Sequence, residues 1–403
     1  MINKSYDIVI VGAGPTGLLA GLSFATKGFN VAVCGKLPTL SNDSLDTRTA
    51  ALFNDSITML DNLCVWPDLK HHCAQIKAIR IVDDMRHSLR GPELMFNADL
   101  LNLQTLGWNV PNASLVEHLT RANAGSVRCE LILGVQVAET YIEHKEVIVK
   151  IEDGNTLRAK LLIGADGQHS NVRQTAGLSI RKIQYSQSAL TTTLKHSRPH
   201  NDISTEFHRP GGPLTVVPLP GNTSSLVWVD TVENINYAMK LDKNLFETTL
   251  EEHLQGVLGG IQKNAARHQF PLSTLTANKL VAKRTALIGE AGHALPPIGA
   301  QGLNLSFRDV AILTDILAQS RKKNLDIGAD SALRHYQAQR ASDIRLRAWG
   351  IDVLNRSLIS TWPGLHFIRG SFSHIIHSIP AIKRVLMRSG LSGTTSQPEL
   401  MRQ

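Results

Sequence analysis

The chain has 403 residues, 42% of them hydrophobic and 19% charged, which is enough for two or three domains with real cores. This composition excludes a collagen, a coiled coil and a largely disordered chain. The net charge of +8 belongs to residues 321–403, which contain 13 Lys and Arg against 5 Asp and Glu. Because the main part of the chain shows no basic face with interleaved aromatic residues, we expect no nucleic-acid partner.

Hydropathy and cysteine usage indicate the compartment. No apolar run approaches the roughly 20 residues of a membrane-spanning helix. Because the first residues, Met1 to Asp7, lead directly into a strand-like run, we expect no signal peptide. The four cysteines lack both CxxC pairs and metal-ligand spacing, so we expect reduced thiols, no metal site and a cytoplasmic location.

The first predicted element is a strand at residues 6–12, a largely β-branched run typical of a parallel sheet that is buried on both faces. The loop Gly12-Ala-Gly14-Pro15-Thr16-Gly17 follows at once. A predicted helix at 18–27 and a strand at 30–34 complete the unit. This order is the context in which a GxGxxG motif indicates a dinucleotide site.

Each glycine of this loop has a separate expected role. Gly12 would make the tight turn, Gly14 would let the backbone approach a diphosphate, and Gly17 would pack the helix on the strand. The free N–H groups at the helix N-terminus would then face the diphosphate. A tight turn in a ligand-free α/β protein is the alternative interpretation.

Further along the chain, short buried strands alternate with a region of a different pattern. Strands are predicted at 131–137, 147–152, 160–163 and 286–289, and helices at 303–319 and, with breaks near Pro363 and Pro380, at 332–388. Residues 190–229 alternate, with turns at 210–213 and 221–222, which predicts an antiparallel sheet of a second domain. The nucleotide-binding domain is therefore expected to be assembled from discontinuous pieces.

Two later segments carry further chemical signals. In the segment from Gly164 to Arg173, a strand ends in Asp166-Gly, which places a carboxylate where α/β folds bind ligands; a simple turn with Ser170 capping a helix is the alternative. In the segment from Gly289 to Asn304, an acidic residue follows a strand and a glycine-rich stretch opens a helix. A Pro/Gly-rich connector is the alternative there.

Taken together, these segments resemble the single-component (class A) flavoprotein aromatic hydroxylases with the p-hydroxybenzoate hydroxylase fold. The sequence is most similar to the branch that hydroxylates ubiquinone precursors. Besides the glycine loop and the Asp-Gly segment, the resemblance includes Asp46-Thr-Arg48-Thr-Ala-Ala-Leu, which matches D-x-R-x-x-A-L. It continues through Pro297-Ile-Gly-Ala-Gln-Gly-Leu-Asn304, Arg308-Asp309 and the segment from Tyr336 to Arg340.

The resemblance implies a mixed α/β (α+β) fold with three parts. These are a Rossmann-like FAD-binding domain (1–70, 112–180 and 280–330), an inserted antiparallel-sheet substrate domain (71–111 and 181–279) and a C-terminal helical region (331–403). It implies FAD as cofactor, NADPH or NADH as co-substrate, and oxygen transfer to an aromatic ring through a flavin C4a-hydroperoxide. No catalytic acid or base can be assigned. The implied cofactor-binding residues are Gly12, Gly14, Pro15, Thr16, Gly17, Arg48, Asp166, Arg173, Gly289, Glu290, Pro297, Gly299, Ala300, Gln301, Gly302, Leu303 and Asn304.

The resemblance places Arg48 against the FAD, Asp166 by its ribityl and diphosphate region, Arg173 near the path of the reductant, and Gly299 to Asn304 at the pyrimidine edge of the flavin. Two positions depart from the family pattern. Gly35 stands where the family has a Glu that holds the adenosine ribose, and Glu290 stands where the family usually has Asp. Loss of the ribose contact would weaken FAD binding about 10- to 100-fold.

Three functions remain open from the sequence. The first is an FAD-dependent monooxygenase acting on the aromatic ring of a ubiquinone precursor, with O₂ and a small, in some cases polyprenylated, aromatic substrate. The second is a hydroxylase of a soluble phenol or another aromatic compound. The third is a non-catalytic scaffold of a biosynthetic complex whose flavin site is weakened at Gly35.

The basic C-terminal region suggests a partner. Five apolar residues are expected on one helical face, with basic residues near them: Leu346, Trp349, Val353, Leu354 and Leu358. Such a face suits the surface of the inner membrane or a biosynthetic complex, and helices packed on the core with solvated basic faces are the alternative.

Overall fold

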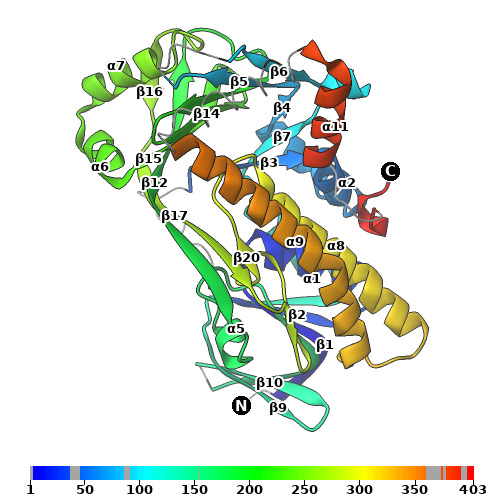
Figure 1. Cartoon of the computed structure of the whole chain (residues 1–403). Helices are drawn as coiled ribbons and strands as arrows, with labels where there is room; N and C mark the ends of the chain where they lie inside the picture. Colours follow the sequence, from blue (N-terminus) through cyan, green and yellow to red (C-terminus); the bar gives the residue numbers. More distant parts are fainter. Residues whose placement is uncertain are drawn as a thin grey trace.

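The computed structural model describes residues 3–36, 46–85, 91–152, 154–359, 374, 378–391 and 397–403. It is an elongated molecule with an eight-stranded sheet at one end and a nine-stranded sheet at the other, joined along its length by α8 (Gln301–Lys322) and α9 (Asp330–Ile359) (Figure 1). This arrangement confirms the predicted mixed α/β fold with helices at its C-terminal end.

The eight-stranded sheet has a parallel centre in the order β19-β11-β1-β2-β8. Ile8, Val9 and Ile10 of its central strand are fully buried, as the sequence predicts for a strand covered on both faces. The remaining three strands pair antiparallel at its margins. The strands of this sheet are β1 (Asn3–Val11), β2 (Val31–Gly35), β8 (Cys129–Leu133), β9 (Val137–Glu143), β10 (Glu146–Ile151), β11 (Thr156–Gly164), β18 (Val281–Ala282) and β19 (Thr285–Leu287).

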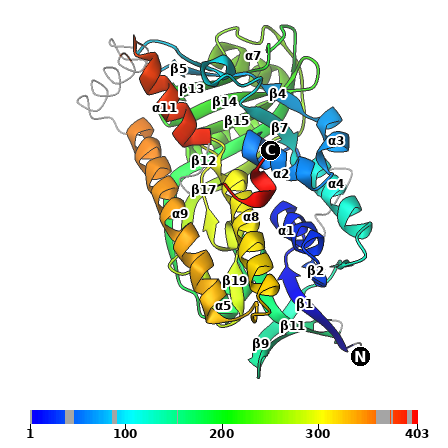
Figure 2. The ribbon, with the colours of Figure 1, turned by 90° about the vertical axis from the view of Figure 1, so that its right-hand side faces the viewer.

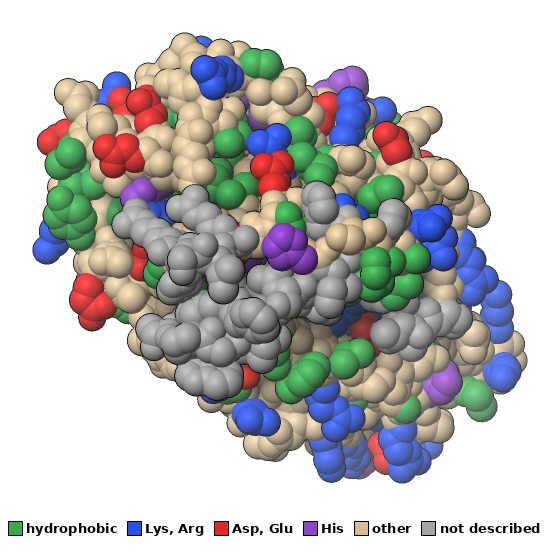
Figure 3. Space-filling view, turned by 45° about the horizontal axis from the view of Figure 1, so that its top comes forward, with side chains coloured by type: hydrophobic (Ala, Val, Ile, Leu, Met, Phe, Trp, Pro, Cys, Tyr) green, Lys and Arg blue, Asp and Glu red, His purple; other side chains and the backbone are tan. Residues whose placement is uncertain are grey.

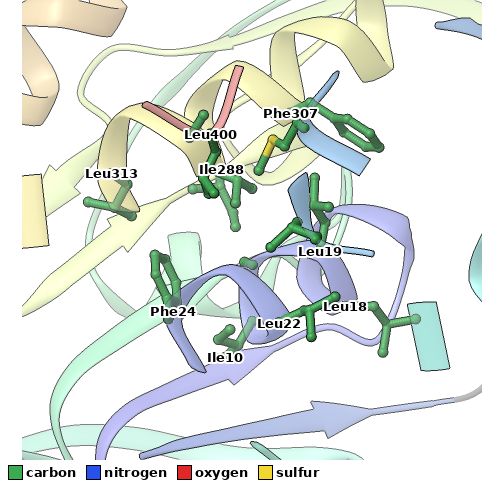
Figure 4. Packing of buried hydrophobic residues seen from close by; sticks show 14 of the residues in the cluster. Ile10, Leu18, Leu19, Leu22, Phe24, Ile288, Phe307, Leu313 and Leu400 are labelled. Atoms are coloured by element: carbon green, nitrogen blue, oxygen red, sulfur yellow. The ribbon is translucent and has the colours of Figure 1, made fainter. Parts of the chain in front are cut away.

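The main hydrophobic core lies on one face of this sheet. The helix α1 (Pro15–Thr26) packs there against α4 (Asn112–Ala124) and α8. The short C-terminal η4 (Glu399–Met401) packs on α2 (Asn54–Asn62) and adds Leu400 to the same cluster. Figure 4 shows part of this cluster, with labels on Ile10, Leu18, Leu19, Leu22, Phe24, Ile288, Phe307, Leu313 and Leu400.

One strand prediction in this domain is wrong. The run 131–137 is not a single strand, because the chain turns at Gly134, where φ is +80°. Residues before the turn pair parallel with β2, and residues after it begin the antiparallel hairpin β9–β10. The apolar pattern alone does not reveal such a turn, since both pieces are partly buried.

The nine-stranded sheet is built around β12 (Ile180–His196), a 17-residue strand that pairs with three others. The predicted turns at 210–213 and 221–222 are confirmed as hairpin connections. One face of this sheet packs on α6 (Val232–Lys240) and α7 (Lys243–His253). The other strands are β5 (Ala78–Asp83), β6 (Leu94–Asn97), β13 (Ile203–Arg209), β14 (Gly212–Leu219), β15 (Thr223–Thr231), β16 (Ile261–Asn264), β17 (His268–Ala277) and β20 (His293–Ala294).

The segment 71–111, expected in the substrate domain, divides between two sheets. Its strands β5 and β6 extend the nine-stranded sheet, whereas β4 (Ala74–Ile76) and β7 (Gly107–Pro111) form a three-stranded sheet with β3 (Thr49–Phe53). Local pattern could not indicate this division, because which strands pair is decided over long range. The domain boundaries as a whole stay a prediction.

The C-terminal region contains α9 and α11 (Pro380–Leu391), so Pro380 begins a helix as expected. The predicted break near Pro363 lies outside the described residues. The small elements not yet placed are α3 (Trp66–Leu69), α5 (Asn171–Thr175), η1 (Lys70–His72), η2 (Ala98–Leu101) and η3 (Gly289–Ala291). Among the described helices, none combines the length and the apolar character needed to cross a bilayer.

Candidate active site

A cleft of about 850 Å³ lies between the carboxyl ends of the parallel strands and the nine-stranded sheet. It is the position at which open α/β sheets bind their ligands. Ten of the predicted cofactor-binding residues line it: Gly12, Gly14, Pro15, Thr16, Arg48, Asp166, Glu290, Pro297, Gly302 and Leu303. The fold therefore gathers segments from both ends of the chain around one cavity.

The glycine loop has the close contacts that the sequence predicts. At Gly12 φ is +119°, and a Cβ would lie 2.2 Å from the Ala165 carbonyl oxygen. At Gly17 a Cβ would lie 1.9 Å from the Gly12 carbonyl oxygen. A Cβ on Gly14, in contrast, would have no protein atom within 4 Å, because this residue borders the open cleft. Gly12 and Gly17 are thus required by packing, and Gly14 leaves room for a ligand.

The first turn of α1 is suited to an anion. Gly14 occupies the N-cap position without a side-chain hydrogen bond to the turn, and Pro15 follows at the first helical position. The N–H groups of this turn and the positive end of the helix dipole therefore stay available on the cleft side. These features fit the diphosphate of a dinucleotide.

The Asp-Gly segment is held in place by its own hydrogen bonds. The Asp166 carboxylate accepts bonds from Ser170 Oγ at 2.5 Å and from the Val172 N–H at 3.2 Å. Ser170 also caps the short helix α5 by accepting a bond from the Arg173 N–H. Asp166 is therefore fixed at the cleft wall.

The structure places Arg173 away from the cleft lining. Arg173 is only 3% exposed, and its guanidinium donates to the Ala291 carbonyl at 2.9 Å and to the Gln168 carbonyl at 2.8 Å. Burial lowers the pKa of this guanidinium. Arg173 therefore joins the Asp-Gly segment to η3, and its expected position near the path of the reductant stays a prediction.

Arg48 lines the cleft and forms a charged pair with Asp46. It donates two bonds to Asp46, at 2.7 and 2.8 Å, and its guanidinium carbon lies 5.3 Å from the centre of the Phe270 ring. The hydrogen bond to Asp46, together with the negative charges of Asp46 and Glu290, raises the pKa of Arg48 against the effect of burial. Arg48 and Glu290 thus place opposite charges in the lining of the same cleft.

Three residues of the segment from Pro297 to Asn304 line the cleft, namely Pro297, Gly302 and Leu303, whereas Gly299, Ala300, Gln301 and Asn304 do not. Gly299 and Ala300 both have positive φ, +68° and +54°, where the loop turns into the helix. Asn304 donates to the Ala51 carbonyl at 2.8 Å and accepts from the Phe53 N–H at 2.9 Å, which ties the loop to β3. Gln301 donates to the Gly390 carbonyl of α11 at 3.2 Å.

Both amide side chains, of Gln301 and Asn304, line a separate small cavity of about 20 Å³. Side-chain contacts from these two residues therefore hold the loop in place, and contact of the loop with a cofactor stays a prediction.

A buried ionic cluster joins α8 to the segment that precedes the loop and to α9. Asp309 accepts bonds from His293 Nε2 at 2.6 Å, from Arg340 Nε at 2.7 Å and from the Gly289 N–H at 2.9 Å. Burial by itself would raise the pKa of Asp309, but the charges of His293 and Arg340 hold it below its ordinary value. The sequence motifs contained Asp309 and Arg340 without indicating that they meet, because only the packing of α9 on α8 brings them together.

Gly35 lies at the end of β2 and lines the cleft without a carboxylate. A Cβ there would lie 2.9 Å from the Ala13 backbone nitrogen. The glycine loop thus occupies the space that a side chain at this position would need. Elsewhere in the described ranges, no three His, Cys, Asp or Glu side chains gather as metal ligands.

Comparison with known proteins agrees with this geometry. A family model described as an FAD binding domain matches residues 5–345. The chain belongs to this FAD-binding family. The resemblance inferred from the motifs is thereby confirmed.

Relatives of known name cover almost the whole chain. The ubiquinone hydroxylase UbiL of Rhodospirillum rubrum is 30% identical over 98% of this chain and 92% of its own length. The 3-demethoxyubiquinol 3-hydroxylase of Escherichia coli is 29% identical over 92% of this chain and 94% of its own length. Among solved structures, the p-nitrophenol 4-monooxygenase PnpA of Pseudomonas putida has a TM-score of 0.79 at 17% identity, covering 98% of this chain and 100% of that one.

Proposed function

We propose that the chain is an FAD-dependent monooxygenase that hydroxylates the aromatic ring of a ubiquinone precursor, with NADPH or NADH as reductant and O₂ as oxidant. Membership in the FAD-binding family and the names of the relatives support this assignment. The observation that carries it is the cleft itself, whose two walls differ in chemistry.

One wall suits the cofactor. The glycine loop, Asp166, Glu290 and the segment from Pro297 to Leu303 supply backbone donors, carboxylates and a rigid turn along the length of the cleft. The opposite wall is a face of the nine-stranded sheet, lined by the apolar side chains Ala189, Val227, Phe270 and Leu272. An aromatic ring with an apolar chain would fit between this face and a flavin.

In this arrangement the protein binds and orients the reactants. When bound, FAD supplies the electron-transfer and oxygen-transfer chemistry. The first turn of α1 would hold the diphosphate, and Asp166 and Glu290 would accept hydrogen bonds from hydroxyl groups of the cofactor. The N-terminus of α8 would offer positive potential to a ring that gains negative charge on reduction. The apolar sheet face would exclude water from the reacting ring.

The first experiment is a titration of purified protein with FAD, followed by NADPH and NADH consumption with short-chain 2-prenylphenols and with prenyl-free phenols. Substrate-dependent consumption with a product heavier by one oxygen atom, found for the prenylated compounds, supports the proposal. Equal turnover of prenyl-free phenols would favour a hydroxylase of soluble aromatic compounds. No saturable FAD binding would leave a non-catalytic scaffold.

We also propose that the C-terminal helices contact an anionic membrane surface, where a polyprenylated substrate resides. Figure 2 shows α9 and α11 along the same side of the molecule. Trp349 of α9 is 65% exposed and Val385 of α11 is 63% exposed. The side chains Arg345, Arg356, Arg384 and Arg388 are exposed on the same two helices. In the face drawn in Figure 3, hydrophobic and basic side chains lie next to each other.

The predicted apolar face needs one correction. Leu346, Trp349, Val353 and Leu354 are exposed, but Leu358 is fully buried and contributes nothing to a docking surface. Sedimentation with vesicles tests the contact. The full chain should bind vesicles rich in phosphatidylglycerol more tightly than neutral ones, and W349S/V385S should reduce this binding. Binding that is equal for both vesicle types would contradict an electrostatic contact.

A further inference from the structure

The sheet face opposite the cofactor wall contains two buried polar atoms that lack a partner. Thr191 of β12 lines the cleft and is 8% exposed, and its Oγ1 has no hydrogen-bond partner in the described part of the protein. The same is true, within those residues, of His268 Nε2 on β17. Burying a hydroxyl or an imidazole nitrogen without a hydrogen-bond partner is unfavourable, so such atoms beside a cleft point to a polar group on a ligand.

The strand register places these two side chains side by side. Thr191 pairs directly with His268 in the antiparallel ladder between β12 and β17. Directly opposed residues share one face of a sheet, with Cβ atoms about 4.5–5.5 Å apart. Phe270, two residues beyond His268, lines the cleft as Thr191 does, which places His268 on the cleft face as well.

Other polar side chains on this face already have partners. Towards the three-stranded sheet, Ser225 accepts bonds from Thr49 Oγ1 at 2.9 Å and from Asn109 Nδ2 at 3.1 Å. Towards α9, the Gln187 side chain accepts a bond from Asn355 Nδ2 at 2.9 Å. The three-stranded sheet and α9 thus cover the two ends of the face.

Between these covered ends, Thr191 lines the cleft and His268 lies opposite it on the same face of the sheet, and the Oγ1 and Nε2 atoms of the two residues are both buried. The apolar side chains on this face are Ala189, Val227, Phe270 and Leu272.

We propose that Thr191 and His268 form a subsite for an oxygen substituent on the aromatic substrate, with a phenolic hydroxyl as the group that satisfies both. The phenol oxygen would accept from the Thr191 hydroxyl, and the phenol proton would be donated to His268 Nε2. The apolar neighbours would contact the ring, so the two hydrogen bonds fix which ring carbon faces the flavin. This assignment rests on the proposed aromatic hydroxylase function and names its specificity-determining residues.

The test compares two probes that differ only in this hydrogen bond: 2-farnesylphenol and its methyl ether. Dissociation constants are measured by isothermal titration calorimetry on the full chain loaded with oxidised FAD. The dissociation constant of the wild type should be about tenfold lower for the phenol than for the methyl ether. The ether lacks the proton that His268 Nε2 would accept, so one neutral hydrogen bond is lost and Nε2 stays without a partner. Thr191→Val and His268→Leu should each remove most of this preference, and Thr191→Ser and His268→Gln should retain part of it.

Thr192→Val is the matched control. The neighbouring Thr192 hydroxyl donates to the Ala265 carbonyl at 2.9 Å, so this variant loses a hydrogen bond without changing the cleft face. It should keep the wild-type preference for the phenol. An unchanged preference in both Thr191→Val and His268→Leu, with wild-type turnover of the phenol intact, would overturn the subsite alone. Absence of phenol binding and turnover in wild type would overturn the proposed function together with the subsite.

Discussion

Gly14→Ala separates the binding role of the glycine loop from its structural role. The backbone at Gly14 has φ −80° and ψ −179°, an extended conformation open to any residue, and the added methyl group would have no protein atom within 4 Å. The free energy of unfolding of the variant should therefore lie within about 0.5 kcal/mol of the wild-type value. The methyl group would, however, project into the cleft beside the first turn of α1.

The expected loss is in FAD affinity. A diphosphate that must move away from the helix N-terminus loses at least one charge-assisted hydrogen bond, worth about 1.5–3 kcal/mol, so the Kd for FAD should rise about 10- to 150-fold. The assay is a fluorescence titration with FAD, paired with urea unfolding of the same samples. Gly350→Ala is the control, since Gly350 lies exposed in α9 and its Cβ would also meet nothing within 4 Å. Unchanged FAD affinity in Gly14→Ala would refute the placement of the diphosphate at this loop.

Three further predictions concern the rest of the molecule. Arg340→Leu leaves Asp309 without its buried guanidinium partner, so urea unfolding should show a loss of about 3–5 kcal/mol; a loss under about 1 kcal/mol would show that the cluster is not needed for stability. The pKa of Asp309 is depressed in the folded state, so its stabilising contribution is complete above about pH 5 and should be lost as the pH falls through the unfolded-state and then the folded-state pKa. Unfolding free energies measured at pH 6, 4 and 3 should decline in that order, and values independent of pH would contradict the assigned charge state. Of the four cysteines only Cys64 is exposed. Burial raises the pKa of the other three thiols, Cys34, Cys73 and Cys129, to about 12. A thiol reagent at pH 8 should therefore modify one cysteine in the native protein and all four in urea.

Features whose conformation is set by residues close together in the sequence could be predicted from the sequence alone. The glycine loop is an example, because the turn at Gly12 and the close approach at Gly17 require the absence of a side chain within a few residues of one another. The buried strand before the loop and the hairpin turns of the antiparallel sheet are further examples, since apolar period and turn residues are local signals. These signals, together with the family resemblance, sufficed for the fold class and for ten of the residues that line the cleft.

The remaining features were decided by contacts between distant segments. Arg173 became a structural tie because Ala291, more than a hundred residues away, supplies its acceptor. Leu358 is buried although it shares a helical face with exposed residues, and only the packing around the end of α9 decides that. Nothing in the local sequence marks Thr191 or His268, and only the register between β12 and β17 places these two residues opposite each other; in the described part of the protein, Thr191 Oγ1 and His268 Nε2 have no hydrogen-bond partner. Local sequence thus determined the glycine loop and the strands around it, and tertiary packing determined which residues from distant segments meet at the cleft.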